Sequence, residues 1–209
     1  TASGTISAWV DIRDNDGGSN QNIVRIVDNS SNNGMSLQFH RANTEFRAVY
    51  RMDGVYKEAT YNEAGFDLAA YIAQDWIHLA MTWQHDGEST GEVKIYYNGT
   101  LKETVAQPNG FPEADEIDIA HIGTNDDASG AFVDGFVDQV TIYNVTKDDE
   151  AVSAMYNGGV MRDLTTFYTN YNPVGLIAYY QFEGNALDSS GNGNHGTLNG
   201  TAGFSTSQP

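Results

Sequence analysis

The sequence predicts an all-β protein, a two-sheet antiparallel jelly-roll sandwich with one short helix. Three segments alternate apolar and polar residues with the period of a strand that has one buried and one solvent-facing side: Trp76–Trp83, Val93–Leu101 and Val133–Asn144. Asn98-Gly99, inside the second segment, favours the positive φ angles of a tight hairpin turn. Neighbouring strands are therefore expected to pair antiparallel.

The same alternation predicts six further strands: Thr5–Ile12, Ile23–Val27, Met35–His40, Phe46–Arg51, Val55–Tyr61 and Ile117–Gly123. The three strands between residues 35 and 61 are expected to form a meander. Phe66–Ile72 is expected to form a short helical turn. Lys147–Tyr156 is the predicted helix, with Thr146 as its N-cap, acidic residues in its first turn and Gly158-Gly159 after its end.

Composition narrows the possible partners. The chain has 209 residues, a length at which a β sandwich commonly folds as one domain. Its 28 acidic and 10 basic residues give a net charge of −18, which repels phosphate backbones and anionic membranes. We therefore expect no nucleic-acid partner and, without an apolar spanning stretch, no membrane insertion.

The absence of cysteine removes disulfides, thiolate catalysis and zinc–thiolate sites from consideration. Together with the acidity, it favours a bacterial extracellular or cell-surface protein. The acidic, asparagine-rich surface suits calcium, which prefers hard oxygen ligands, although surface acids also serve solubility.

With these segments in view, the chain resembles a laminin-G-like domain of the concanavalin-A-like lectin/glucanase superfamily. Thr5–Val10 (TISAWV) is similar to an early strand of that family, and Trp76–Trp83 (WIHLAMTW) to a later one. Val93–Gly99 (VKIYYNG) resembles its hairpin, and Ala131–Asn144 its closing segment. The resemblance spans about residues 5 to 158 in the family's order.

One segment departs from the family's order. Leu176–Gly200 resembles the family's opening strand and Gly/Asn-rich turn, yet here it comes last. Either residues 1–209 form a single permuted or split domain in which 174–209 supplies the usual first strand, or the chain ends inside a next repeat. We expect the single domain, because a sheet without that strand would expose an unpaired edge.

An enzyme is the weaker hypothesis. A retaining glycosidase needs two carboxylates about 5 Å apart, and Glu113–Asp118 (EADEID) offers them only within what we expect to be a solvated acidic loop. The sequence shows neither a nucleophile elbow nor a phosphate-binding loop before a helix. The five histidines lack zinc-site spacing, and His78 is expected to be structural.

The resemblance implies a structural Ca²⁺ between the closing segment and the C-terminal segment. The candidate ligands there are oxygen-bearing side chains: Asp138, Glu183, Asp188, Asn192 and Asn194. The alternative is that Asp188 and the two asparagines only shape turns through side-chain-to-backbone hydrogen bonds.

A second oxygen cluster lies on two loops that the family topology could bring to one rim, where relatives hold an external ligand. Its residues are Asp28, Asn29, Asn125, Asp126 and Asp127. Ordinary acidic loops are the alternative, and the one we favour. Asp14–Gly17 resembles part of an EF-hand loop but lacks the downstream glutamate, so we reject it.

The meander offers a third surface. Its predicted strands carry Gln38, His40, Arg47, Arg51, Tyr56 and Glu58, and Arg41, Arg47 and Arg51 are three of the ten basic residues. Faces of this fold bind sugars by aromatic stacking and bidentate hydrogen bonds. A solvated face with cross-strand ion pairs is the favoured alternative.

The predicted function is a non-catalytic, calcium-dependent carbohydrate-binding module, lectin-like, in a large extracellular bacterial protein such as an adhesin. Its partners would be a carbohydrate or cell-surface glycan and the neighbouring domains of the larger protein. The alternative is a structural or protein-interaction spacer domain. A glycoside hydrolase comes third.

Overall fold

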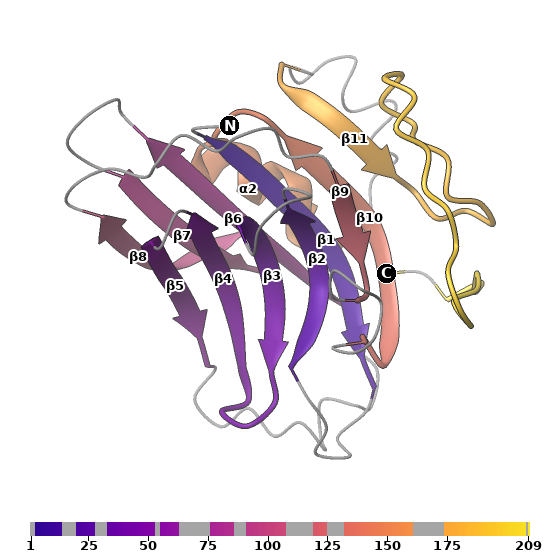
Figure 1. The fold of residues 1–209 in the computed structure, drawn as a ribbon, viewed down its shortest axis with the longest axis horizontal. Helices are drawn as coiled ribbons and strands as arrows, with labels where there is room; N and C mark the ends of the chain where they lie inside the picture. The colour runs from indigo at the N-terminus through magenta and orange to yellow at the C-terminus, as the bar shows by residue number, and fades with distance from the viewer. Residues whose placement is uncertain are drawn as a thin grey trace.

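The fold is a β sandwich of two antiparallel sheets, as predicted (Figure 1). The computed structural model describes residues 3–13, 20–27, 33–52, 55–62, 76–85, 91–107, 119–124, 132–160, 174–207 and 209. The predicted turn at 66–72 and the acidic segment 113–118 lie outside these residues.

Six strands form one sheet in the order β11-β10-β1-β6-β7-β8. Their bounds are β1 Gly4–Ile12, β6 Ile77–His85, β7 Gly91–Tyr97, β8 Thr100–Gln107, β10 Gly135–Tyr143 and β11 Leu176–Tyr180. All three segments that carried the fold prediction lie in this sheet. The predicted hairpin is confirmed, because Asn98 and Gly99 have φ of 48° and 71° between β7 and β8.

Five strands form the other sheet in the order β5-β4-β3-β2-β9. They are β2 Gln21–Val27, β3 Gly34–His40, β4 Glu45–Met52, β5 Val55–Tyr61 and β9 Ile119–Ile122. The expected meander is therefore confirmed as β3, β4 and β5, and its register fixes which side chains become neighbours.

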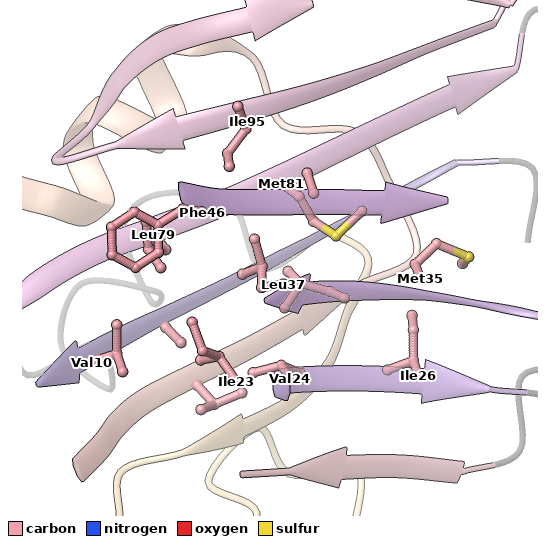
Figure 2. Close-up of a cluster of buried hydrophobic side chains, with 14 of the residues drawn as sticks. Val10, Ile23, Val24, Ile26, Met35, Leu37, Phe46, Leu79, Met81 and Ile95 are labelled. Atoms are coloured by element: carbon pink, nitrogen blue, oxygen red, sulfur yellow. The ribbon is translucent and has the colours of Figure 1, made fainter. Parts of the chain in front are cut away.

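The core lies between the two sheets, where alternate residues of each strand interdigitate. Figure 2 shows this packing, with Leu37 of β3 and Met81 of β6 among the buried side chains from both layers. Because side chains alternate along a strand, the residues between these core positions point to the outer faces. The outer faces therefore carry the polar chemistry.

α2 (Asp149–Tyr156) lies on the outer face of the six-stranded sheet, where Val152 packs with Ala80 and Tyr96 (Figure 1). The N-cap prediction was wrong. Asp148, not Thr146, is the N-cap and accepts a hydrogen bond from the Ala151 N–H at 2.8 Å. The Thr146 hydroxyl instead donates to the Trp83 carbonyl of β6 at 2.7 Å, so this side chain is used in a contact with the sheet.

The helix ends where predicted. Asn157 takes the left-handed conformation after Tyr156 and begins the short 3₁₀ turn η1 (Asn157–Gly159). In the described part of the chain, no helix combines the length and apolar character that a membrane span requires.

The C-terminal segment folds back on the sandwich. β11 pairs antiparallel with β10, with Tyr179 opposite Thr141, and lies at the edge of the six-stranded sheet (Figure 1). The exposed tail after residue 190 runs beside β11. That this segment replaces the family's first strand in a single domain stays a prediction.

The two sheets also meet along one edge. β5 and β8 are edge strands of different sheets, and the Glu103 carboxylate of β8 accepts a hydrogen bond from the Thr60 N–H of β5. This contact satisfies a donor that the β4–β5 ladder leaves unused.

Gly135 allows β10 to approach β1. It has a φ of +149°, and a Cβ atom there would lie 1.9 Å from the Asp11 carbonyl oxygen. We expect Gly135→Ala to lower the free energy of unfolding by about 2–5 kcal/mol, measured by urea denaturation. Gly158→Ala is the control, since that residue has positive φ but open space around it, and should cost only about 1 kcal/mol. Equal effects of the two substitutions would contradict the close approach.

Candidate functional site

The outer face of the five-stranded sheet carries a patch of interacting polar side chains, here called the polar face. The cross-strand register builds it, because Arg47 lies between Gln38 and Thr60, and Arg51 lies opposite Tyr56. Its described members are Arg25, Ser36, Gln38, His40, Glu45, Arg47, Arg51, Tyr56, Glu58, Thr60 and His121.

Arg47 is the centre of this face. Its guanidinium donates through Nε to Glu45 Oε1 at 2.7 Å, with a second contact from Nη2, and through Nη1 to Glu58 Oε2 at 3.2 Å. Both Arg47 and Glu45 side chains are only 14% exposed, which strengthens their attraction compared with an exposed pair. Although burial alone would raise the pKa of Glu45, hydrogen bonds from Asn43 and Arg47 and the charge of Arg47 lower it.

Tyr56 stands at the border of this network with its ring exposed. The side chain is 52% exposed, and its hydroxyl donates to Glu58 Oε2 at 2.6 Å. Burial, followed by the hydrogen bond and charge of Glu58, raises the pKa of Tyr56 to about 12, so the phenol remains neutral. The ring is thus held by one end while a large apolar surface faces solvent.

Both predictions for the meander find a counterpart here. The ion pairs expected from a solvated sheet face are present, and the predicted ligand-binding residues Arg47, Arg51 and Tyr56 share one surface. Glu45 was missed, although it directly precedes the predicted strand and lies opposite His40 in the register. A hairpin register assigned from the short 41–44 turn could have found it.

In the C-terminal segment, the predicted calcium ligand Asp188 is surrounded by hydrogen-bond donors of the chain itself. The Asp188 carboxylate accepts four hydrogen bonds, two on each oxygen: Oδ1 from the N–H groups of Tyr179 and Ser190, and Oδ2 from the Ser190 hydroxyl and the Asn194 N–H. These distances lie between 2.8 and 3.0 Å. A carboxylate offers about four lone-pair sites, so the lone pairs that a metal would use are engaged.

Asn192 and Asn194 complete this arrangement. The Asn192 side-chain amide donates to the carbonyls of Leu176 and Ile177, and the Asn194 amide donates to Ile177, at 2.8–3.0 Å. Together with Asp188 they bind backbone groups of β11 where it has no neighbouring strand, so we call these three residues the edge cap. This is the alternative of side-chain-to-backbone hydrogen bonds that the sequence left open.

Hydrogen bonding also sets the charge state of the edge cap. Burial alone would raise the pKa of Asp188, but the bonds from Tyr179, Ser190 and Asn194 hold it below its ordinary value. Asp188 is therefore an anion at neutral pH whose charge is already compensated by fixed donors.

Asp138 and Glu183 are the remaining members of the predicted calcium set. Asp138 is 6% exposed and accepts from the Gln139 N–H at 2.8 Å. Burial, with a contribution from the negative charge of Glu183, raises the pKa of Asp138 to about 6. A buried carboxylate near a second carboxylate is chemically suited to a hard cation.

Within the described ranges, no group of three or more His, Asp or Glu side chains has the spacing of a metal site. A calcium ion at this place would therefore depend on Asp138 and Glu183 together with neutral oxygen ligands. Its binding stays a prediction.

The second predicted cluster falls on residues the structure does not describe: Asp28, Asn29, Asn125, Asp126 and Asp127. The strands before them are described. In the antiparallel β2–β9 pair, Val27 lies opposite Ile119 and Val24 opposite Ile122, so the C-terminal ends of the two strands lie at opposite ends of the pair. The prediction of a shared rim stays untested.

His78 occupies the structural position that was predicted. It is 1% exposed, and its ring lies 5.4 Å from that of Trp9 in an edge-on arrangement. Burial lowers its pKa to about 3, so the imidazole is neutral at pH 7.

Comparison with known proteins places the chain in a family. A family model of laminin G type, described as the concanavalin A-like lectin/glucanases superfamily, matches residues 1–153. The chain belongs to this superfamily. The match covers β1 to β10 and the start of α2, so β11 and the edge cap lie beyond it. No curated protein matches the sequence.

Solved structures share this lectin/glucanase fold at low sequence identity. The receptor-binding domain of botulinum neurotoxin mosaic serotype C/D is 16% identical with a TM-score of 0.51, covering 75% of this chain and 36% of that one. The type G receptor-binding domain is 15% identical with a TM-score of 0.51, covering 75% and 38%. A SAP-like pentraxin from Limulus polyphemus is 13% identical with a TM-score of 0.49, covering 74% and 70%. The chain thus spans little more than a third of the toxin domains.

We expect Asp188→Asn to destabilise the protein, because an amide group would face backbone N–H donors that the carboxylate now satisfies. The free energy of unfolding should fall by about 2–4 kcal/mol in urea denaturation. Asp148→Asn is the control, since asparagine caps a helix as well as aspartate does, and should change it little. An unaltered Asp188→Asn protein would show that the edge cap contributes nothing to stability.

Asp138→Asn should stabilise the protein at pH 7 in the absence of divalent cations. The folded-state pKa of about 6 exceeds the ordinary 3.8, so Asp138's contribution to stability is complete below about pH 4 and lost as pH rises through 6. The difference in melting temperature between variant and wild type should therefore shrink from pH 7 to pH 4. A difference that is constant over this range would contradict the raised pKa.

Proposed function

We propose that this chain is a non-catalytic carbohydrate-binding module that holds its ligand on the polar face. One observation carries the proposal: the exposed ring of Tyr56 lies beside a network of planar charged groups already fixed in position. Sugars bind to proteins by placing an apolar ring face on an aromatic side chain while their hydroxyls bond to polar groups around it. The Tyr56 border of the polar face offers both.

Preorganisation favours this role. Arg47 and Glu58 are held by each other and by Glu45 and Tyr56, so little side-chain entropy remains to be lost when a ligand binds. The remaining lone pairs of the two glutamate carboxylates are the acceptors that sugar hydroxyls would contact.

The family supports a binding role without specifying the ligand. The superfamily includes lectins, and the two toxin structures compared above are receptor-binding domains by name. At 15–16% identity this likeness concerns the fold, and the glycan partner of the present chain is our inference from its own surface.

The charges on the polar face favour binding over hydrolysis. A glycosidase needs one carboxylic acid with a raised pKa to protonate the leaving group. Glu45 and Glu58 instead share Arg47, and the pKa of Glu45 is lowered. Both carboxylates therefore act as fixed acceptors.

We further propose that calcium binds at Asp138 and Glu183 and has a structural role. The ion would neutralise two nearby carboxylates and so offset both the burial of Asp138 and the repulsion from Glu183, which together raise the pKa of Asp138. At pH 7, calcium should then raise the melting temperature of the wild type but not of Asp138→Asn. An equal rise in melting temperature for the two proteins would contradict the site. So would no rise when calcium is added to EDTA-treated wild-type protein.

The setting we propose is a bacterial extracellular or cell-surface protein, such as an adhesin, in which this module stands beside other domains. The absence of cysteine and the net charge of −18 support it.

A glycan array tests the proposed function. We expect wild-type protein to bind at least one glycan, and Tyr56→Ala to weaken that binding about three- to tenfold by removing the stacking surface. Phe204→Ala is the control, because Phe204 is also an exposed aromatic residue but lies in the C-terminal tail. A spacer domain would bind no glycan, and equal binding by Tyr56→Ala would exclude the polar face.

A further inference from the structure

We infer that the polar face selects a glycan that carries a carboxylate group, with Arg51 as the residue that recognises it. The inference rests on the proposed function and specifies its ligand class. It follows from the way the acidic and basic groups of this face are paired with one another.

Both glutamates of the polar face already have partners. Glu45 Oε1 accepts from Asn43 and Arg47, while Glu58 Oε2 accepts from Arg47 and Tyr56. Arg51 is exposed, and its side chain makes no hydrogen bond or ion pair with the described residues. The face thus has a guanidinium without an internal carboxylate.

Among the described residues, Arg51 and Tyr56 form one exposed surface that a ligand can reach. Tyr56 is the neighbour of Arg51 on β5, whereas the place above its β3 neighbour, Gly34, is filled by the Val27 side chain. Residues directly opposite on adjacent strands have Cβ atoms about 5 Å apart, close to the width of one sugar ring. A sugar stacked on Tyr56 would therefore place a ring substituent at the Arg51 guanidinium.

Charge distribution favours an anion at this place. The described polar face has three arginines (Arg25, Arg47 and Arg51) against two glutamates, a balance of +1, whereas the whole chain has a net charge of −18. A guanidinium presents parallel N–H donors that match the two oxygens of a carboxylate.

The net charge of the chain also limits how densely charged the ligand can be. A densely sulfated polymer would be repelled by the surrounding acidic surface, since one unpaired arginine cannot offset −18. A glycan with isolated carboxylates, such as one containing uronic or sialic acid residues, fits better.

The test measures binding by calorimetry for four acidic probes: trigalacturonate, trimannuronate, a glucuronate disaccharide and sialyllactose, each with its uncharged methyl ester. We expect at least one acid to bind and its ester to bind at least about tenfold more weakly. The affinity for the acid should also fall as salt concentration rises.

Two variants with the same charge change complete the design. Arg51→Gln should weaken binding of the acid at least about tenfold without changing its ester, while Lys94→Gln, on the outer face of the other sheet, should bind like wild type. Arg51 is exposed, so unaltered circular dichroism and melting temperature should confirm that the variant folds.

The outcomes separate the two proposals. Acid and ester binding equally, neutral glycans binding when none of the acids does, or Arg51→Gln behaving like Lys94→Gln would each overturn the carboxylate inference and leave the proposed function intact. Failure of every glycan, acidic or neutral, would overturn both.

Discussion

The sandwich depends on the pairing of one central strand with two partners from distant parts of the chain. β1 binds β6 on one side and β10 on the other, and all nine of its residues are buried. Its core-facing residues pack between the sheets, while Ser7 on the outer side bonds the Thr141 hydroxyl at 2.7 Å. Because β10 then carries β11, this strand also determines where the C-terminal segment folds back.

Polar groups outside the core are satisfied in two different ways. At β11, side chains of the edge cap take the place of a neighbouring strand, and the Asp188 carboxylate is fully engaged by three backbone N–H groups and the Ser190 hydroxyl. On the polar face, arginine and glutamate side chains bond to each other and leave groups facing solvent. The first arrangement contributes to stability, and the second leaves a surface on which a ligand can be held.

The strands could be predicted because their apolar residues alternate over long segments, and the Asn98-Gly99 turn because few dipeptides accept two positive φ angles. The helix cap could not be placed, since Thr146 and Asp148 are both capping residues and only tertiary contact with Trp83 distinguishes them. Asp188 shows a more general difficulty. The same oxygens bind calcium or backbone amides, and the sequence does not reveal how many N–H donors the fold will bring to them. Likewise, Arg47 was recognised as a binding candidate, but its partner Glu45 depends on the hairpin register.

Side chains that cover two of the sheet edges affect how neighbouring copies of this domain can associate. Glu103 occupies the Thr60 amide at the rim of one layer, and Asp188, Asn192 and Asn194 occupy the rim of the other. A strand from an adjacent copy would have to displace these side chains before it could pair with β5 or β11. Neighbouring copies are therefore kept from joining their sheets along these two edges.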